Sequence, residues 1–340
     1  MKPPRLRWWL SLLAPVCLAA GEPRLELVWP TPNTAYAEGK PIDTFVQATA
    51  SGDPASGLFG CARSGGHQFH EGLDLKPIKR DRRGESLDDI FAVMSGVVRH
   101  INARAGDSNY GRYLVIEHAE VQPPVYSLYA HLSAVSPGLK VGHAVKAGQV
   151  IATMGRTSGG STIPRERAHL HFEIGLMVTR QFQSWYTWKK FGSPNEQGLY
   201  NGMNLMGIDA LDFFTQLRAG RVSGLEKYFA QLAAVARVRV ATARVPDLVQ
   251  RYPQLLAAEV PAAGVAGWEI KVGATGLPLS WKPLSATDVL GYQANEVRLL
   301  DVDGEALRRC RCKSIAVLKR GQYQPGRDLE TVLQLTLGLR

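Results

Sequence analysis

Three short segments of the 340-residue sequence carry histidines at spacings that suit metal chemistry. His70 and Asp74 stand four residues apart in FHEGLD, and His169 and His171 stand two apart in AHLHFEI. The residues around the second pair favour a strand, on which positions two apart project from the same face. His131, in YAHLS, lies on or just after another expected strand. We expect these side chains to share one cavity.

Two imidazoles and a carboxylate form a workable catalytic zinc site when the fourth position is left open for water. Zinc lowers the pKa of that water and polarises a carbonyl group. A remaining histidine pair could accept the proton and stabilise the oxyanion. Each motif is weak alone, because paired histidines on strands are common and an H-x-x-x-D spacing arises by chance. We assign no functional role to the other histidines, which are His67, His100, His118 and His143.

Residues 61 to about 178 have the pattern of a mainly β domain. Their short apolar runs are separated by Gly, Pro, Ser and Asn, which is typical of antiparallel strands joined by turns. The runs are FAVMSGVV (91–98), YLVIEH (113–118), VYSLYAHL (125–132), QVIATM (149–154) and HLHFEIGL (169–176).

The pattern changes near residue 200, where we place a domain boundary. Asp209 can cap a helix over 209–218, and Ser223 with Glu226 forms a capping-box pair for a second helix. Strand signals return later, with Asp303–Gly304 as an expected hairpin turn. The C-terminal part is therefore predicted to be a smaller α+β domain.

The N-terminus has the three parts of a secretory signal peptide. Lys2, Arg5 and Arg7 precede an uncharged run over residues 8–20, and small residues follow it. That run is too short to span a bilayer, which takes about 20 apolar residues. We expect export to the periplasm, cell envelope or exterior, with residues 1–20 removed and no transmembrane segment left. The predicted plan is then a lead-in over 21–60, a β domain over 61–200 and a C-terminal domain over 201–340.

The sequence is basic, with a formal net charge of +10 that falls to about +7 once Lys2, Arg5 and Arg7 are removed. A composition of 45% hydrophobic and 21% charged residues excludes a disordered chain, a collagen and a disulfide-dense miniprotein. The positive charge suggests an anionic partner. Export argues against nucleic acid and favours a wall polymer or lipid headgroups.

Three cysteines remain after Cys17 leaves with the signal peptide. Cys310 and Cys312 are too close in sequence to pair comfortably. Cys61 could pair with either of them, or all three could be buried thiols. Cys61 also lies nine residues before His70, so a thiolate there could fill the open zinc position in a latent form.

The segments FHEGLDL, YAHLS, GLKVGHAVKAGQVIATMGRTSG and AHLHFEIG occur in the order and spacing of the lysostaphin-type (β-lytic) zinc endopeptidases, which cut peptidoglycan peptides. The resemblance covers roughly residues 60–178. It implies a small antiparallel β core of the duplicated hybrid motif type, with the site in a groove on one sheet. It also implies one Zn²⁺ per chain held by His70, Asp74 and His171, with His131 and His169 in the catalytic role.

The resemblance leaves the scissile bond, the oligomeric state and the role of residues 201–340 open. A silent member that binds the wall or activates another hydrolase is the alternative, although such proteins usually lose ligands and none is lost here. A biotinyl or lipoyl carrier domain is disfavoured, because the hairpin tip at 154–156 has no lysine. Residues 179–204, with Trp185 and Trp188, could rim the groove or cover the second domain. The basic segment 76–89 is expected to be a solvated loop.

Overall fold

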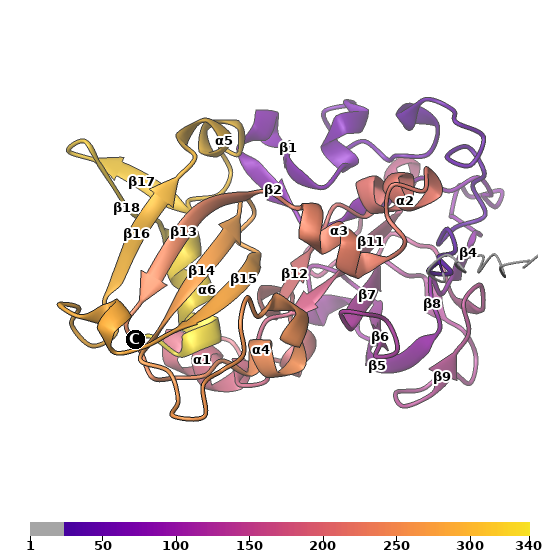
Figure 1. Cartoon of the computed structure of the whole chain (residues 1–340). Helices are drawn as coiled ribbons and strands as arrows, with labels where there is room; N and C mark the ends of the chain where they lie inside the picture. Colours follow the sequence, from indigo (N-terminus) through magenta and orange to yellow (C-terminus); the bar gives the residue numbers. More distant parts are fainter. Residues whose placement is uncertain (1–23) are drawn as a thin grey trace, which may run out of the picture.

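The computed structural model describes residues 24–340 of the chain (Figure 1). The expected signal peptide over residues 1–20 and Cys17 lie outside this range. Within it, no helix is both long enough and apolar enough to cross a membrane.

The N-terminal two thirds of the described chain is built on antiparallel sheets, which confirms the predicted β fold. The main sheet has the order β12-β11-β7-β6-β5-β9, and β3 pairs with β11 beside that path. A second sheet has the order β4-β10-β8, and β1 pairs with β2. The strands are β1 (Gly60–Arg63), β2 (Gln68–His70), β3 (Leu73–Leu75), β4 (Asp89–Phe91), β5 (Gly96–Asn102), β6 (Tyr113–His118), β7 (Val125–Ala130), β8 (Ala134–Val135), β9 (Ala144–Val145), β10 (Val150–Thr153), β11 (Leu170–Met177) and β12 (Leu205–Gly207).

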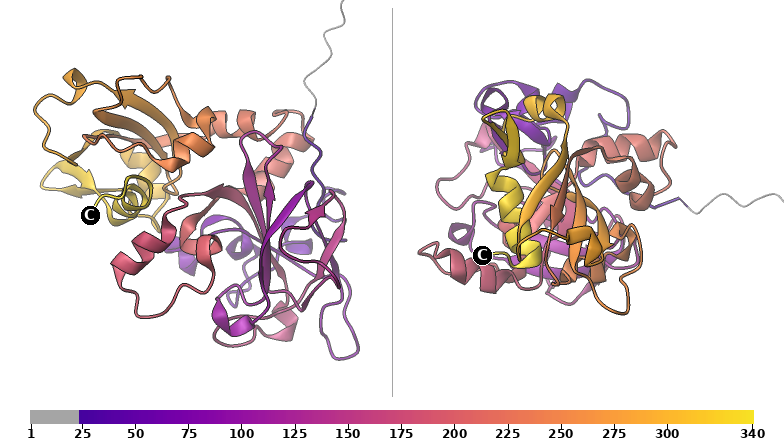
Figure 2. Two further views of the ribbon diagram at one scale, coloured as in Figure 1. Left: turned by 90° about the horizontal axis from the view of Figure 1, so that it is seen from below. Right: turned by 60° about the vertical axis from the view of Figure 1, so that its left-hand side comes forward.

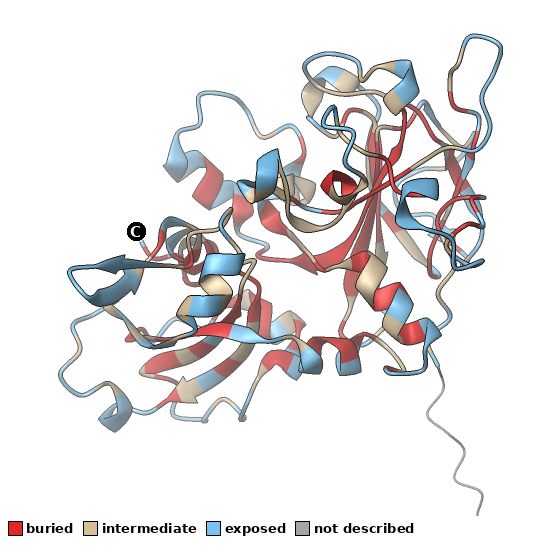
Figure 3. Cartoon of the chain, turned by 90° about the horizontal axis from the view of Figure 1, so that it is seen from above, coloured by how far each residue is buried: buried red, intermediate tan, exposed pale blue. Residues whose placement is uncertain are grey.

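The centre of the main sheet is covered on both faces, so its strands are buried along their whole length (Figure 3). This explains why β7 and β11 appear in the sequence as continuous apolar runs rather than alternating ones. The run over 91–98 is an exception, because it divides between β4 and β5 with a buried link between them.

The lead-in is not loose chain. Trp29 stacks on Tyr36 with ring centroids 4.4 Å apart, and both rings contact Phe45. Val46 forms a β-bridge with Leu75, so the lead-in runs beside β3. Two 3₁₀ turns, Ile42–Thr44 and Pro54–Gly57, lie in this segment.

The C-terminal part is α+β, as predicted. Its four-stranded sheet has the order β15-β14-β13-β16, and a hairpin of β17 and β18 projects from it (Figures 1 and 3). The strands are β13 (Ala234–Val240), β14 (Gly267–Gly273), β15 (Pro278–Leu284), β16 (Val297–Val302), β17 (Ala316–Lys319) and β18 (Gln322–Pro325). The helices of the whole chain are α1 (Phe182–Lys189), α2 (Ala210–Arg218), α3 (Leu225–Gln231), α4 (Asp247–Arg251), α5 (Gly304–Arg309) and α6 (Arg327–Leu337).

The local signals in this part were only partly right. Asp209 caps α2 by accepting a hydrogen bond from the Asp212 backbone N–H, as expected. Helix α3 begins at Leu225, with Gly224 rather than Ser223 at the cap position. Asp303 does not turn a hairpin, because its carboxylate caps α5 instead. Both functions suit Asp, and the sequence pattern alone did not separate them.

The two parts of the chain lie side by side and share contacts (Figure 2). The predicted boundary near residue 200 stays a prediction, although β12 beyond it joins the main sheet and Phe214 of α2 contacts Phe172 of β11. Helix α1 bridges the parts, because Trp185 packs with Leu335 of α6 and donates a hydrogen bond to Gln334.

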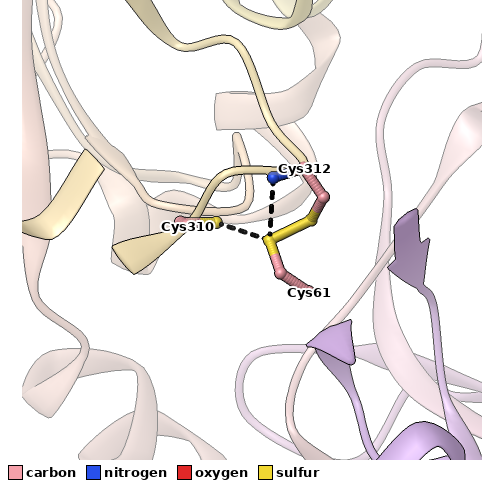
Figure 4. Close-up of side chains that lie close together, drawn as sticks. All are labelled: Cys61, Cys310 and Cys312. Atoms are coloured by element: carbon pink, nitrogen blue, oxygen red, sulfur yellow. Dashed lines mark hydrogen bonds between the residues drawn. A yellow bond between two sulfur atoms is a disulfide. The ribbon is translucent and has the colours of Figure 1, made fainter. Parts of the chain in front are cut away.

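A disulfide between Cys61 and Cys312 ties β1 to the loop after α5, across 251 residues of sequence (Figure 4). Cys310 keeps a free thiol, and its Sγ atom lies 3.2 Å from the Sγ atom of Cys61. With Cys61 paired in this way, it has no thiolate to offer a metal. The hypothesis of a latent form capped by Cys61 is therefore not supported.

This arrangement predicts unequal effects of removing each cysteine. Cys61→Ser should lower stability by about 2–5 kcal/mol, because it removes the disulfide and leaves Cys310 and Cys312, which are too close in sequence to replace it. Cys312→Ser should cost less, since Cys310 is placed to form a substitute bridge, and Cys310→Ser should change little. Calorimetric melting and thiol titration of the three variants test this; equal losses in Cys61→Ser and Cys312→Ser would contradict the substitute bridge.

Candidate metal and active site

Strand pairing brings the predicted ligands together. On β11, His171 stands directly opposite Asp74 of β3 and, on the other side, opposite Ala130 of β7. His131 follows Ala130 immediately, at the end of β7. Gly72 allows the turn between His70 and Asp74 to pack on β11, because a Cβ there would lie 2.4 Å from the Phe172 carbonyl oxygen.

Three buried atoms that could bind a metal ion lie close together. His70 Nε2, His171 Nδ1 and Asp74 Oδ1 lie 3.0–3.1 Å from one another. Neighbouring ligands around a tetrahedral ion with bonds of 2.0–2.1 Å stand about 3.3 Å apart. The spacing of the three atoms therefore suits a small ion.

A hydrogen bond on the far side of each imidazole decides which of its two nitrogens carries the proton. His70 donates its Nδ1–H to the Leu58 carbonyl at 2.8 Å, and His171 donates its Nε2–H to Glu173 at 2.9 Å. Each ring is thereby left with a lone pair on the nitrogen that faces the other ring. Two lone pairs 3.0 Å apart repel unless a proton on one ring or a metal ion lies between them. The donor set thus fits a divalent metal such as zinc.

His131 points its free nitrogen toward the same place. Its Nδ1–H donates to the Thr157 carbonyl at 2.7 Å, and its ring lies edge-on to those of His169 and His171. Burial, and then the neighbouring His169, holds the pKa of His131 well below its usual value. The backbone at His131 is left-handed, with φ of 61°, a conformation that non-glycine residues rarely adopt outside special sites.

His169 is held in the same way, by donation of its Nδ1–H to the Arg167 carbonyl at 2.7 Å. Its Nε2 atom is buried, has no hydrogen-bond partner and lies 3.5 Å from Asp74. A buried polar atom without a partner is costly, so it indicates a site for a ligand or water. Burial lowers the pKa of His169.

Glu173 is a site residue that the sequence analysis missed. Its buried carboxylate accepts hydrogen bonds from His171, from Tyr110 at 2.6 Å and from Tyr126 at 2.7 Å. The alternation that pairs His169 with His171 on one face of β11 also extends to Glu173, so the signal was present in the sequence. Burial and the Glu173 charge raise the pKa of both tyrosines, which stay protonated donors.

Charge is balanced around His171 from both sides. Burial opposes a charge on its ring, but hydrogen bonds to Asp74 and Glu173 outweigh burial and raise its pKa to about 9. Arg63 of β1 also donates to the outer oxygen of Asp74, at 2.7 Å. The carboxylates of Asp74 and Glu173 outnumber the single guanidinium of Arg63, so the charge of the site favours binding of a cation. Nothing in the sequence pattern around Arg63 indicated this contact.

A cavity of about 960 Å³ opens onto this cluster. His131 and His171 line it, together with Tyr110, Phe69 and Trp185. Residues 179–204 were expected either to rim the groove or to cover the second domain. Trp185 does both, because it lines the cavity and packs against α6.

The basic segment 76–89 is largely exposed, as expected, and Glu85 within it pairs with Arg156 and Arg165. All five predicted site residues, which are His70, Asp74, His131, His169 and His171, are thus brought together.

Comparisons with solved structures give partial matches. A zinc-containing peptidase from Vibrio cholerae is 31% identical over 31% of this chain and 26% of its own, with a TM-score of 0.23. A putative glycyl-glycine endopeptidase LytM from Ruminococcus gnavus is 28% identical over 32% and 39%, with a TM-score of 0.26. The catalytic domain of lysostaphin from Staphylococcus simulans is 26% identical over 39% and 82%, with a TM-score of 0.26.

The chain thus spans about a quarter of the Vibrio cholerae peptidase. A search of curated proteins found no match. The sequence model of peptidase family M23 matches residues 68–182, which hold the five clustered residues and Glu173. Over this segment the chain matches peptidase family M23, the lysostaphin-type family that the motifs resemble.

Proposed function

We propose that the chain is an exported, zinc-dependent endopeptidase that hydrolyses peptide bonds of peptidoglycan. The observation that carries the proposal is the convergence of His70, Asp74 and His171 beside two further buried histidines. Membership of a peptidase family, and the signal-peptide pattern at the N-terminus, support it.

His70 Nε2, Asp74 Oδ1 and His171 Nδ1 would hold the zinc. When bound, zinc supplies an activated water and polarises the scissile carbonyl. Glu173 holds His171 in the tautomer that leaves Nδ1 free, and Arg63 fixes the second oxygen of Asp74.

His131 and His169 act on protons. Each donates its Nδ1–H to a backbone carbonyl and turns Nε2 toward the cluster, and burial keeps each ring neutral. Either ring can take a proton from the attacking water on Nε2, and the imidazolium so formed stabilises the developing oxyanion and returns the proton to the departing amine. The T-shaped contact between the rings, with centroids 4.7 Å apart, keeps both within reach of one peptide bond.

Product analysis tests the proposal directly. Purified peptidoglycan treated with the protein should release new peptides, seen by mass spectrometry, that vanish with a chelator and return with zinc. Their masses identify the bond cut. Absence of new peptides from a preparation with stoichiometric zinc contradicts the enzyme and leaves the alternative of a wall-binding or hydrolase-activating member.

Variants of the cluster should separate metal binding from turnover. Asp74→Ala and His171→Ala should lose zinc and activity together, because each removes a ligand. His131→Asn should keep zinc but lower kcat by about 10²–10⁴-fold. Asn is chosen because it tolerates the left-handed backbone at this position. Metal analysis beside turnover checks this, and loss of zinc from His131→Asn contradicts the role given to His131.

Glu173 should act through His171 rather than on substrate. Glu173→Gln keeps the shape but removes the charge that holds the His171 proton, so zinc affinity should fall about 10–100-fold. Competition with a chromogenic chelator measures this. Glu117→Gln, which removes a carboxylate from β6 in the same sheet, is the control. Equal zinc affinity in the two variants would show that Glu173 has no such role.

A further inference from the structure

The cavity that opens on the histidine cluster is not built by the M23 segment alone. Its far wall comes from the C-terminal part, which contributes Thr275, Lys313 and the α6 residues Asp328 and Thr331. These positions lie more than 90 residues beyond the end of the family match at residue 182. One continuous space therefore joins His131 and His171 to a surface that the family motifs do not describe.

Three contacts hold this wall in place. The disulfide between Cys61 and Cys312 ties the loop before Lys313 to β1, the strand that carries Arg63 (Figure 4). Lys313 places its ammonium group 4.1 Å from the centroid of the Phe69 ring, one residue before His70. Helix α6 packs on α1 through Leu335 and Trp185. The wall is thus fixed relative to the site and needs no closure.

The size and polarity of this space indicate its occupant. At about 960 Å³ it lies at the upper end of ordinary ligand sites, which are about 300–1,000 Å³, so it has room for a large, branched substrate. The wall carries charges of both signs, Lys313 against Asp328, with Glu71 on the facing β2–β3 turn. A substrate with amines and carboxylates on branches to both sides of the scissile bond matches this surface.

We infer that the C-terminal part forms a substrate-binding wall that selects crosslinked peptides over single stem peptides, with Thr331 among the residues that line it. The inference rests on the proposed function, since it states where another part of the same substrate binds. Thr331 is one of two half-exposed residues of α6 that line the cavity, with Asp328, and its hydroxyl donates a hydrogen bond to the Arg327 carbonyl of its own helix. A larger side chain there occupies the cavity without disturbing a contact between the two parts.

The test compares Thr331→Trp with Glu330→Trp. Glu330 is exposed on the same helix, one residue away, and does not line the cavity. The probes are a crosslinked muropeptide dimer and a monomeric tetrapeptide muropeptide. The preference is measured as the ratio of the two Kd values, by calorimetry in the His131→Asn background, and cleavage of each probe is measured with His131 intact. The protein with Thr331 should bind the dimer about 10-fold more tightly than the monomer. Thr331→Trp should remove that preference, and Glu330→Trp should keep it.

Each result decides the matter. A preference unchanged in Thr331→Trp, or no preference in the parent protein, overturns the inference, while zinc-dependent cleavage of either probe would leave the proposed function standing. Binding that depends on residue 331 without any cleavage supports the wall and contradicts the enzyme. Neither binding nor cleavage overturns both.

Discussion

The register of β11 is the constraint on which the site depends. Side chains alternate along a strand, so a slip of one residue would turn His169, His171 and Glu173 away from the cluster together. The register is set on both sides, by β3 placing Asp74 opposite His171 and by β7 placing Ala130 there. Because β11 is buried along its length, any slip would also bring polar side chains into the apolar face.

His171 connects this register to the chemistry. One ring nitrogen faces Asp74 and the other donates to Glu173, so a single imidazole joins the metal-facing side of the cluster to the tyrosine network behind it. The other histidines use backbone carbonyls as their rear acceptors. A carbonyl orients a ring without adding charge, whereas Glu173 adds a full negative charge at the one ring that lies between two carboxylates. The second carboxylate therefore increases the attraction of this site for a divalent cation.

Much of this site could be predicted from the sequence because its residues lie in short, regular segments. The H-x-H spacing and the strand-forming neighbours fix which face the two histidines share, and the same reasoning extended by two residues would have found Glu173. Arg63 could not be found, because its contact with Asp74 depends on how β1 and β2 fold back over the site. The cysteine pairing was left open for the same reason, since only the folding of the loop after α5 beside β1 brings Cys310 and Cys312 to Cys61 and joins Cys312 to it. The prediction at Asp303 failed for a different reason. Asp suits both a hairpin turn and a helix cap, and the residues that follow it determine which of the two forms.

The position of the C-terminal part has a consequence for how the two halves of the chain relate. A separate wall-binding module would need only a flexible link to the M23 segment. Here the link is instead a disulfide, a shared helix packing and a strand, β12, in the main sheet. Such rigid contacts hold the far wall of the cavity at a fixed place relative to His131 and His171. Fixed placement reduces the entropy lost when an extended substrate binds at both the site and the wall. If the far wall of the cavity were joined by a flexible link, it would have to be ordered again each time a substrate bound. This is the physical reason to assign the C-terminal part to substrate selection rather than to separate attachment to the cell wall.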